Sequence, residues 1–405
     1  MLMRSRRRTR GFTLIELLVA VTAGLFVAIG AFALARQSSR FFQQEARLAN
    51  AQFSATLGFD RLRADIARAG FLATSNIQRD PFFCGNPALL PSGMASLAAI
   101  RILEAKPADA QDSLNSLAPD QLTLSGSYSS AETFPVRTVV EEEGKYNVYL
   151  QANTGAIART DYGGAEGGTL PQIFKAGRVL RILDAGGKYE FGAIESYAVN
   201  GSGQMVVSLK RDPAIPFKRA GGTCGVEGLG VGMQANVVNR IRYEIRNVQK
   251  NPPEGYKPLY AAGATAPGDE SRRELVRVEL DSDEAEMADS LEIVAEYAVD
   301  LKFGLTVAAG FKTPANLDPE LSQFAIGDPK NYEYFAGVGA TDRGPHRIRA
   351  VRARFAVRSR EADRAAGIEA PAGNLFRYQL PGGGFARART LTADIGLPNL
   401  AGVAW

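Results

Sequence analysis

The longest apolar run of the chain lies near its N-terminus. Residues 12–35 contain a single ionisable side chain, Glu16. Wound as a helix, these 24 residues would extend about 36 Å, enough to cross a bilayer core of ~30 Å. The pattern therefore predicts a membrane-spanning helix that carries one carboxylate close to its start.

A second pattern predicts that this helix continues beyond the membrane. Past Arg36, apolar residues recur at steps of three and four, and charged and amide side chains lie between them. We expect an amphipathic helix over 36–70 that ends near Gly70, a residue suited to a helix C-terminus, with Gly58 as a point where it can kink. Its apolar face should be buried in a globular body, through Phe42, Ala46, Ala49, Phe53, Leu57, Leu62, Ile66 and Ala69.

The rest of the chain, 71–405, shows mainly short alternating runs bounded by Gly, Pro, Asn and Asp, which are typical of strands. One helical period is predicted, over 283–294. Residues 126–170 and 306–340 read as loops or insertions, and an internal boundary is expected near 225. The expected fold class is α+β, a long N-terminal helix followed by a β-rich globular body. Strands are predicted at 121–124, 178–183, 191–196, 205–209, 237–245, 275–280, 298–305 and 347–358.

The charge of the chain is concentrated at its N-terminus. The formal net charge is +4, and the first ten residues include five arginines, so the remainder is close to neutral. This distribution does not indicate a nucleic-acid partner. A basic segment before an apolar span predicts a cytoplasmic N-terminus and an exported body.

The segment "GFTLIELLV", residues 11–19, resembles the type III signal of type IV prepilins and pseudopilins. The resemblance implies a leader over 1–11 that a prepilin peptidase removes after Gly11. It also implies N-methylation of the new first residue, Phe12, and makes Glu16 the fifth residue of the mature protein. Residues 12–35 would then be the assembly helix in the inner membrane.

A carboxylate inside a membrane span is costly and usually has a partner. After cleavage, Phe12 would carry a positive α-amino group, and Glu16 of a neighbouring subunit or of the same chain would pair with it and set the axial register. The alternative is a glutamate that reaches back to the membrane interface. Small residues on one helix face, which permit close helix packing in lipid, are Ala20, Gly24 and Ala28.

The body resembles PilW-type minor pilins in several segments, among them "PDQLTLSGSY", "GRVLRILD" and "HRIRAVRARFAVRSRE". Pseudopilins of the J type share the last of these. The resemblance implies a minor pilin that sits in the bacterial inner membrane with a periplasmic body and then enters a pilus. Its implied partners are other minor pilins, the major pilin and a tip adhesin, and it needs no cofactor.

Cys84 and Cys224 are the only cysteines. In an exported body an even count indicates a disulfide, with two unpaired thiols as the alternative. A zinc site is not expected, because no CxxC motif occurs and the chain has a single histidine, His346.

Catalytic motifs are absent from the sequence, so we expect a structural protein and no enzyme. His346 is interpreted as a surface or hydrogen-bonded residue. The run "DSDEAEMAD", 281–289, offers calcium ligands in Asp281 and Asp283 but lacks the glycine and final glutamate of an EF-hand loop. A solvated acidic helix start is the favoured interpretation.

Three arginines share one face of the strand predicted at 347–358. Alternation places Arg352, Arg354 and Arg358 on the side opposite Val351 and Phe355. One interpretation is a solvated outer face that discourages edge pairing. The other is contact with an acidic patch on another subunit or with a phosphate backbone, which would make the protein a pilus-tip module that binds DNA or surfaces.

Overall fold

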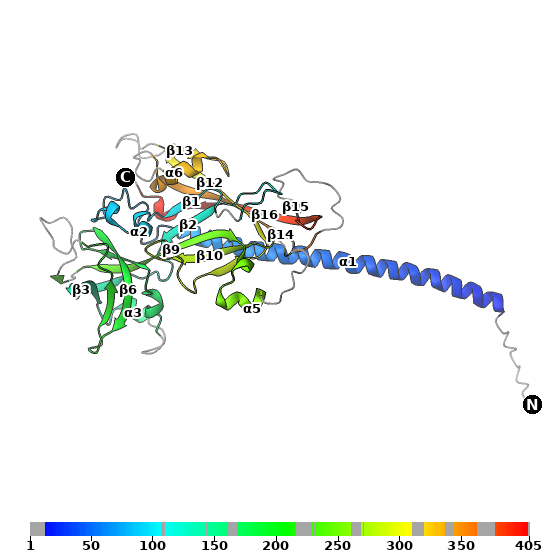
Figure 1. Ribbon diagram of the computed structural model, residues 1–405, viewed down its shortest axis with the longest axis horizontal. Coiled ribbons are helices and arrows are strands. Elements are labelled where there is room, and N and C mark those ends of the chain that lie inside the picture. Colours follow the sequence, from blue (N-terminus) through cyan, green and yellow to red (C-terminus); the bar gives the residue numbers. More distant parts are fainter. Residues whose placement is uncertain are drawn as a thin grey trace, which may run out of the picture. The chain divides into compact units, whose positions relative to one another are not determined.

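The computed structural model describes residues 13–106, 110–142, 144–160, 168–215, 228–229, 232–260, 269, 271–309, 320–336, 343–362 and 377–403. The chain divides after Asn50 into two units, one formed by the start of the long helix and one by the body. The predicted α+β class, a long apolar N-terminal helix followed by a β-rich body, is confirmed (Figure 1).

Helix α1 spans Leu14–Ala67 without interruption. It ends three residues before Gly70, whose φ of +77° lies in the left-handed region that glycine adopts without strain. Gly58 lies inside the continuous helix, where a Cβ would come within 2.8 Å of Ala295 Cβ. This glycine therefore allows close packing of the helix on the body.

The body half of α1 packs on two antiparallel sheets. On one side, the strands follow the order β1, β2, β9, β10 and β11. Their bounds are Ile100–Leu103, Gln121–Gly126, Gln234–Arg246, Glu274–Leu280 and Glu292–Ala295. The helix contributes Ala55, Phe59, Leu62 and Ile66 to a core that also contains residues of these strands and of the second sheet.

The second sheet has five strands in the order β13-β12-β14-β16-β15. It is coloured from yellow to red in Figure 1. Its strands are Glu320–Gln323, Ala298–Ala309, Ile348–Arg358, Phe385–Gly396 and Arg377–Gln379, respectively. Its apolar face, which includes Phe303 and Phe355, joins the core around the helix.

The start of β9 belongs to a closed barrel. Around the ring, β9 pairs with β5, then follow β6, β7, β4 and β3, and β3 returns to β9 through Phe134↔Ala235 and Pro135↔Gln234. The barrel encloses its own apolar core. The strands β3 to β7 are Phe134–Glu142, Lys145–Leu150, Val179–Leu183, Tyr189–Val199 and Met205–Leu209, and β8 (Gly228–Leu229) pairs with β3.

Short helices connect these elements. The α-helical ones are α2 (Ser92–Ala95), α3 (Gly155–Thr160), α4 (Leu170–Ile173), α5 (Lys257–Tyr260) and α6 (Lys330–Ala336). The 3-10 helices are η1 (Pro87–Leu89), η3 (Val248–Lys250), η4 (Glu254–Tyr256), η5 (Pro345–Arg347) and η6 (Pro398–Leu400).

All the strands predicted above overlap a strand of the structure. The interpretation of 126–170 and 306–340 as loops was wrong, and so was the helix predicted over 283–294. Residues 126–170 contain β3, β4 and α3, and 306–340 contain β13 and α6. The helix predicted over 283–294 is a loop followed by β11. There, Glu284 and Glu286 bind arginines of β9, so tertiary ion pairs outweigh a local helical period.

A buried carboxylate joins helix α1 to the first sheet. Asp65 Oδ2 accepts hydrogen bonds from Tyr243 Oη on β9 at 2.7 Å and from Arg277 Nε on β10 at 2.8 Å. Tyr128 Oη donates to the Asp65 backbone carbonyl at 2.9 Å. Burial, with Asp65 beside it, raises the pKa of Tyr243 well above its ordinary value, so the phenol stays a donor.

Replacing Asp65 should destabilise the body strongly. In Asp65→Ala, the Arg277 cation and the Tyr243 hydroxyl would be buried without their acceptor, a loss of about 3–5 kcal/mol. The measurement is denaturant unfolding of the full chain in detergent, followed by circular dichroism. Asp60→Ala is the control, because Asp60 is exposed and makes a surface ion pair with Arg63 at 3.6 Å. This variant should lose less than ~1 kcal/mol of unfolding free energy. Equal losses in the two variants would contradict the role given to Asp65.

Candidate assembly helix

The start of α1 is closed by a reciprocal pair of hydrogen bonds. The Thr13 backbone N–H and Thr13 Oγ1 both donate to Glu16 Oε2 at 2.9 Å, and the Glu16 N–H donates to Thr13 Oγ1 at 3.3 Å. This is a capping box, which satisfies N–H groups that a helix start leaves without partners. The T-x-x-E pattern is readable in the sequence, although no capping box was predicted from it above.

The capping box holds the Glu16 carboxylate at the first turn of the helix. Both bonds that Glu16 accepts end on Oε2, so among the described residues Oε1 is left to accept another donor. Gly11 and Phe12 lie outside the described residues, and the pairing of Glu16 with a Phe12 amine therefore stays a prediction.

The apolar part of α1 is uncovered. The most apolar 18-residue window of Leu14–Gln43 has a mean hydropathy of 2.5 and none of it is buried, so by length and composition this segment is a candidate membrane span. Ala20, Gly24 and Ala28 are exposed on it, and a Cβ added to Gly24 would meet no atom within 4 Å. The described part of the chain thus leaves the small-residue face free for another helix.

The body half of α1 has two apolar faces, one buried and one exposed, whereas its sequence pattern predicted a single buried face. Ala55, Leu62 and Ile66 are fully buried, but Phe53 and Leu57 are 67% and 54% exposed. The helical period explains this, since Phe53 and Leu57 lie about half a turn from Ala55 and Leu62. The expectation that Phe53 and Leu57 are buried was wrong, because the sheets cover only one side of the helix. Phe42, Ala46 and Ala49, which were expected on the same buried face, are exposed as well.

The three arginines of β14 do not form one exposed face. Arg352 Nε binds Asp394 at 2.7 Å and Arg354 Nε binds Asp300 at 2.8 Å. Arg358 is only 1% exposed and its guanidinium lies between the rings of Tyr297 and Tyr378, at 5.1 and 5.3 Å.

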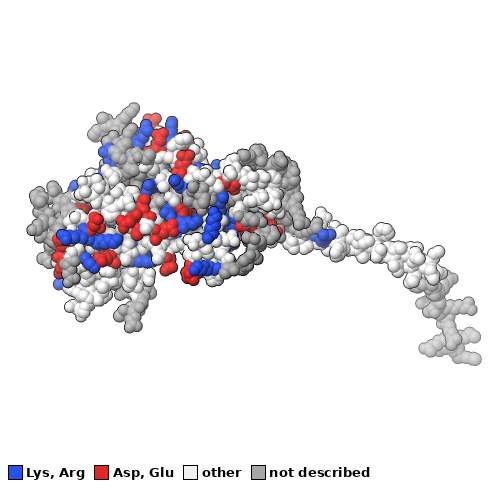
Figure 2. Space-filling view, in the orientation of Figure 1, with Lys and Arg blue, Asp and Glu red and all other residues white. Residues whose placement is uncertain are grey.

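The expectation of an exposed Arg358 was therefore wrong, because the rings of Tyr297 and of Tyr378 on β15 lie against its guanidinium. Figure 2 shows the same balance more widely, with basic and acidic side chains interspersed on the visible face of the body. Partner binding through Arg352 and Arg354 remains untested.

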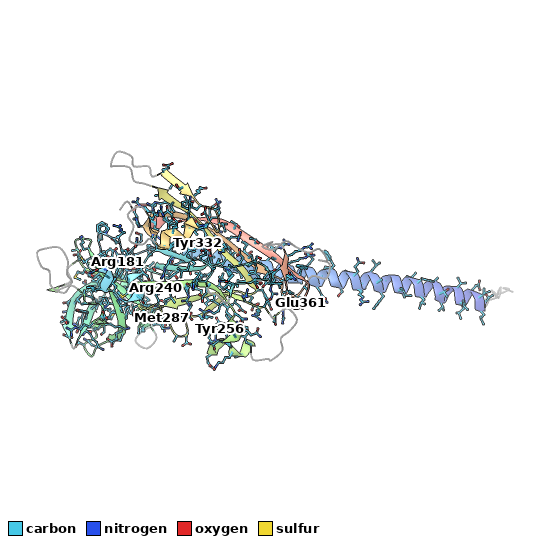
Figure 3. The ribbon with its side chains drawn as sticks, turned by 45° about the horizontal axis from the view of Figure 1, so that its top comes forward. Arg181, Arg240, Tyr256, Met287, Tyr332 and Glu361 are labelled. Atoms are coloured by element: carbon cyan, nitrogen blue, oxygen red, sulfur yellow. The ribbon has the colours of Figure 1, made fainter. Side chains whose placement is uncertain are left out.

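The acidic run 281–289 is a loop and not a helix start. Asp281 Oδ1 accepts the backbone N–H groups of Asp283 and Ala285 at 2.8 and 2.9 Å. Glu284 Oε1 pairs with Arg101 at 2.6 Å and with Arg240, labelled in Figure 3, at 2.8 Å. The described residues contain no group of three or more ligands that could hold a metal ion.

An open cavity of about 550 Å³ lies between this loop and the segment around η4. Met287 and Tyr256, both labelled in Figure 3, line its two sides. Arg246 also lines it and is bound by Glu286, with Arg246 Nη1 at 3.1 Å from Glu286 Oε2. The ion pair leaves the lining close to charge balance.

Cys84 is disulfide-bonded. Its backbone N–H donates to the carbonyl of Tyr189 on β6 at 3.0 Å, which attaches this segment to the barrel. Cys224 lies outside the described residues, so the Cys84–Cys224 pairing stays a prediction.

His346 is buried, with 1% of its surface exposed, and its Nδ1 lies 3.2 Å from Asn76 Nδ2. The interpretation as a hydrogen-bonded residue fits this contact. Burial, and after it the positive charges of Arg347, Arg349 and Arg79, together lower the pKa of His346 to about 4.

This histidine should make the fold sensitive to acid. Its pKa is lower in the folded chain than the ordinary 6.5, so the unfolded chain takes up a proton first as the pH falls below 6.5 and stability is lost down to about pH 4. His346→Gln should reduce the loss of unfolding free energy between pH 7 and 4.5 by about 2 kcal/mol. An unchanged loss in denaturant titrations of the full chain at the two pH values would refute this.

Comparison with known proteins identifies the start of the chain. Residues 6–32 match the family model of the prokaryotic N-terminal methylation motif. No curated protein and no solved structure matches the chain. The motif and the apolar helix support a protein of the type IV pilin and pseudopilin class, which is processed by a prepilin peptidase. The match does not reach the body, so the PilW-type resemblance is unsupported by it.

Proposed function

We propose that this protein is a minor pilin of a type IV pilus, most similar to the PilW type. In this proposal the leader 1–11 is removed and Phe12 is methylated. The processed chain is then held in the bacterial inner membrane as a single-pass protein with a periplasmic body. It then enters the filament, where it helps to start assembly or lies at the tip. The match of residues 6–32 to the methylation motif is the observation that carries the proposal.

The surface of α1 supports an assembly role. Lipid can cover the exposed apolar side chains of the membrane span. Phe53 and Leu57, however, are exposed on the part of the helix that packs on the body, beyond the span. Apolar side chains exposed in water favour association with another apolar surface. Helices of neighbouring pilins, including the major pilin and other minor pilins, would cover both segments.

Body size supports a low copy number. Residues 51–405 form one unit, for which the scaling of compact domains gives a radius of gyration of about 20 Å. Packed helices are only about 8–10 Å apart. Adjacent copies in a filament would therefore compete for space around the helical core, and a terminal position avoids this competition, next to other minor pilins or a tip adhesin.

A J-type pseudopilin of a type II secretion system is the alternative within the same class, because the methylation motif supports it equally. A module that binds DNA or surfaces through Arg352 and Arg354 has less support, since Asp394 and Asp300 already neutralise these side chains.

Variants at two residues should separate cleavage of the leader from assembly into filaments. Protein extracted from membranes should begin at methylated Phe12 by N-terminal mass analysis, and Gly11→Leu should retain the leader. Glu16→Ala should be cleaved normally but be recovered in sheared filaments at least about tenfold less, because the axial register loses its ion pair.

Glu45→Gln is the control for Glu16→Ala, since Glu45 is an exposed carboxylate on the same helix beyond residue 35, and it should assemble normally. A mature N-terminus downstream of residue 35 would overturn the proposed function. Normal assembly of Glu16→Ala would overturn only the role of Glu16.

The exposed face of α1 should matter for assembly and not for folding. The double variant Phe53→Gln, Leu57→Gln should change the unfolding free energy by less than about 1 kcal/mol, because both side chains are already exposed. Its recovery in sheared filaments should fall several-fold. The matched variant Phe59→Ala removes a side chain from the buried face and should cost about 3–5 kcal/mol. Wild-type recovery of the double variant would show that this face has no partner.

A further inference from the structure

One carboxyl group points into the barrel. On β6, alternation directs Tyr189, Phe191 and Ala193 to one apolar cluster and Ile194 to the core of the barrel. Gly192 is on the barrel side, because a Cβ there would lie 2.7 Å from the core residue Leu209. Glu190 shares this side and pairs in register with Ile182 of β5, which is also in the barrel core.

Glu190 is almost fully buried, with 3% of its surface exposed. Within the part of the chain that the structure describes, its Oε1 is buried and has no hydrogen-bond partner. A Cβ added to Gly85 would come within 3.1 Å of Oε2, so the segment that follows Cys84 closes over the carboxyl group. A polar group buried in this way is costly, and the cost rises sharply if it is charged.

The charged groups nearest in the chain are engaged elsewhere. The Arg181 guanidinium, labelled in Figure 3, lies 4.1 Å from the centre of the Tyr189 ring. Asp80 accepts a hydrogen bond from Tyr189 Oη, and Lys188 Nζ donates to the carbonyl of Pro81 at 3.0 Å. Tyr189 belongs to the outer side of β6, opposite Glu190.

The segment over Glu190 is attached to β6 by two backbone hydrogen bonds. The Cys84 N–H donates to the Tyr189 carbonyl, and the Tyr189 N–H donates to the Phe82 carbonyl, both at 3.0 Å. Both bonds are made by Tyr189, the residue that precedes Glu190, so a movement of residues 82–85 that admits water to Glu190 would strain or break them.

We propose that Glu190 is a proton-controlled latch. The neutral acid stays packed on the barrel side of β6, covered by residues 82–85. When the carboxyl group ionises, it must be hydrated, and residues 82–85 separate from β6 to admit the water. This inference concerns the barrel and goes beyond the pilin function proposed above.

The direction of the pH effect follows from the burial. Burial alone raises the pKa of Glu190 to about 8 from an ordinary value of 4.5. Between these values the folded chain holds the proton and the unfolded chain does not, so the stability contributed by the neutral acid is complete below pH 4.5 and is lost as the pH rises through 8. An ordinary paired carboxylate behaves in the opposite way.

The test is amide hydrogen exchange of the full chain in detergent micelles, at pH 6.5 and 9 and corrected for the intrinsic exchange rate. For a group whose pKa is near 8 when closed and 4.5 when open, ionisation at pH 9 should raise the opening of peptides that contain Phe83 to Gly85 and Tyr189 to Phe191 about thirtyfold relative to pH 6.5. The rate at which a phosphine reduces the Cys84 disulfide should rise by a similar factor.

Two variants separate this latch from a general effect of alkaline pH. Glu190→Gln keeps the shape of the side chain and cannot ionise, so its opening should be the same at both pH values. Glu195→Gln removes an acid of the same strand that is bound to Lys145 at 2.9 Å, and it should keep the wild-type response. Equal ratios in wild type and Glu190→Gln would overturn the proposal.

A measurement on the wild-type chain covers the case in which Glu190→Gln does not fold. Infrared spectra of protein labelled with ¹³C in its glutamate carboxyl groups should show a protonated carboxyl band at pH 6.5 that disappears as the pH rises through 8. Absence of that band at pH 6.5 would overturn the proposal. Either result leaves the processing test of the pilin function unaffected.

Discussion

The buried Asp65 carboxylate is the interaction on which the arrangement of the body depends. An acid in the last turn of a helix opposes the helix macrodipole, so Asp65 needs the cation and hydroxyl that β9 and β10 provide through Arg277 and Tyr243. These bonds fix the rotation of α1 about its axis. The rotation in turn places Leu62 and Ile66 in the core and leaves Phe53 and Leu57 outside it.

Strand β9 extends this arrangement to the barrel. Its first residues, among them Ala235 and Val237, face the barrel core, and its later residues, among them Tyr243 and Ile245, face the core around α1. Arg240 lies between these two parts and is buried against Glu284. A single strand thus carries both cores, and the ion pair at its middle supplies the charge compensation that a buried arginine needs.

Most charged groups of the body that suggested chemistry have partners within it. The acids at 284 and 286 bind arginines of β9, and the arginines at 352 and 354 bind aspartates. Some of these pairs lie at the surface, as Arg352 and Asp394 do, and others have a buried member, as Arg240 and Asp300 show. In both cases the pairing leaves few uncompensated charges to attract a ligand. Unlike these charged groups, the exposed apolar surface of α1 has no partner among the described residues of the body. Lipid or another protein is needed to remove it from water.

The sequence by itself determined the features that depend on local pattern and on solvent. The length of the apolar run, the position of Gly70 and the alternation of most strands each follow from contacts within a few residues, and the start of the chain has a motif that can be recognised without a fold. It also contained the capping box of Thr13 and Glu16, which was there to be read.

Only the tertiary structure decided which face of a regular element is covered. Phe53 and Ala55 have the same helical neighbourhood in the sequence, and Arg352 and Arg358 share one side of a strand, yet one of each pair is exposed and the other buried. The barrel, the loop at 283–291 and the isolation of Glu190 likewise depend on residues far apart in the chain. Burial and ion pairing are long-range properties, and a local pattern cannot specify them.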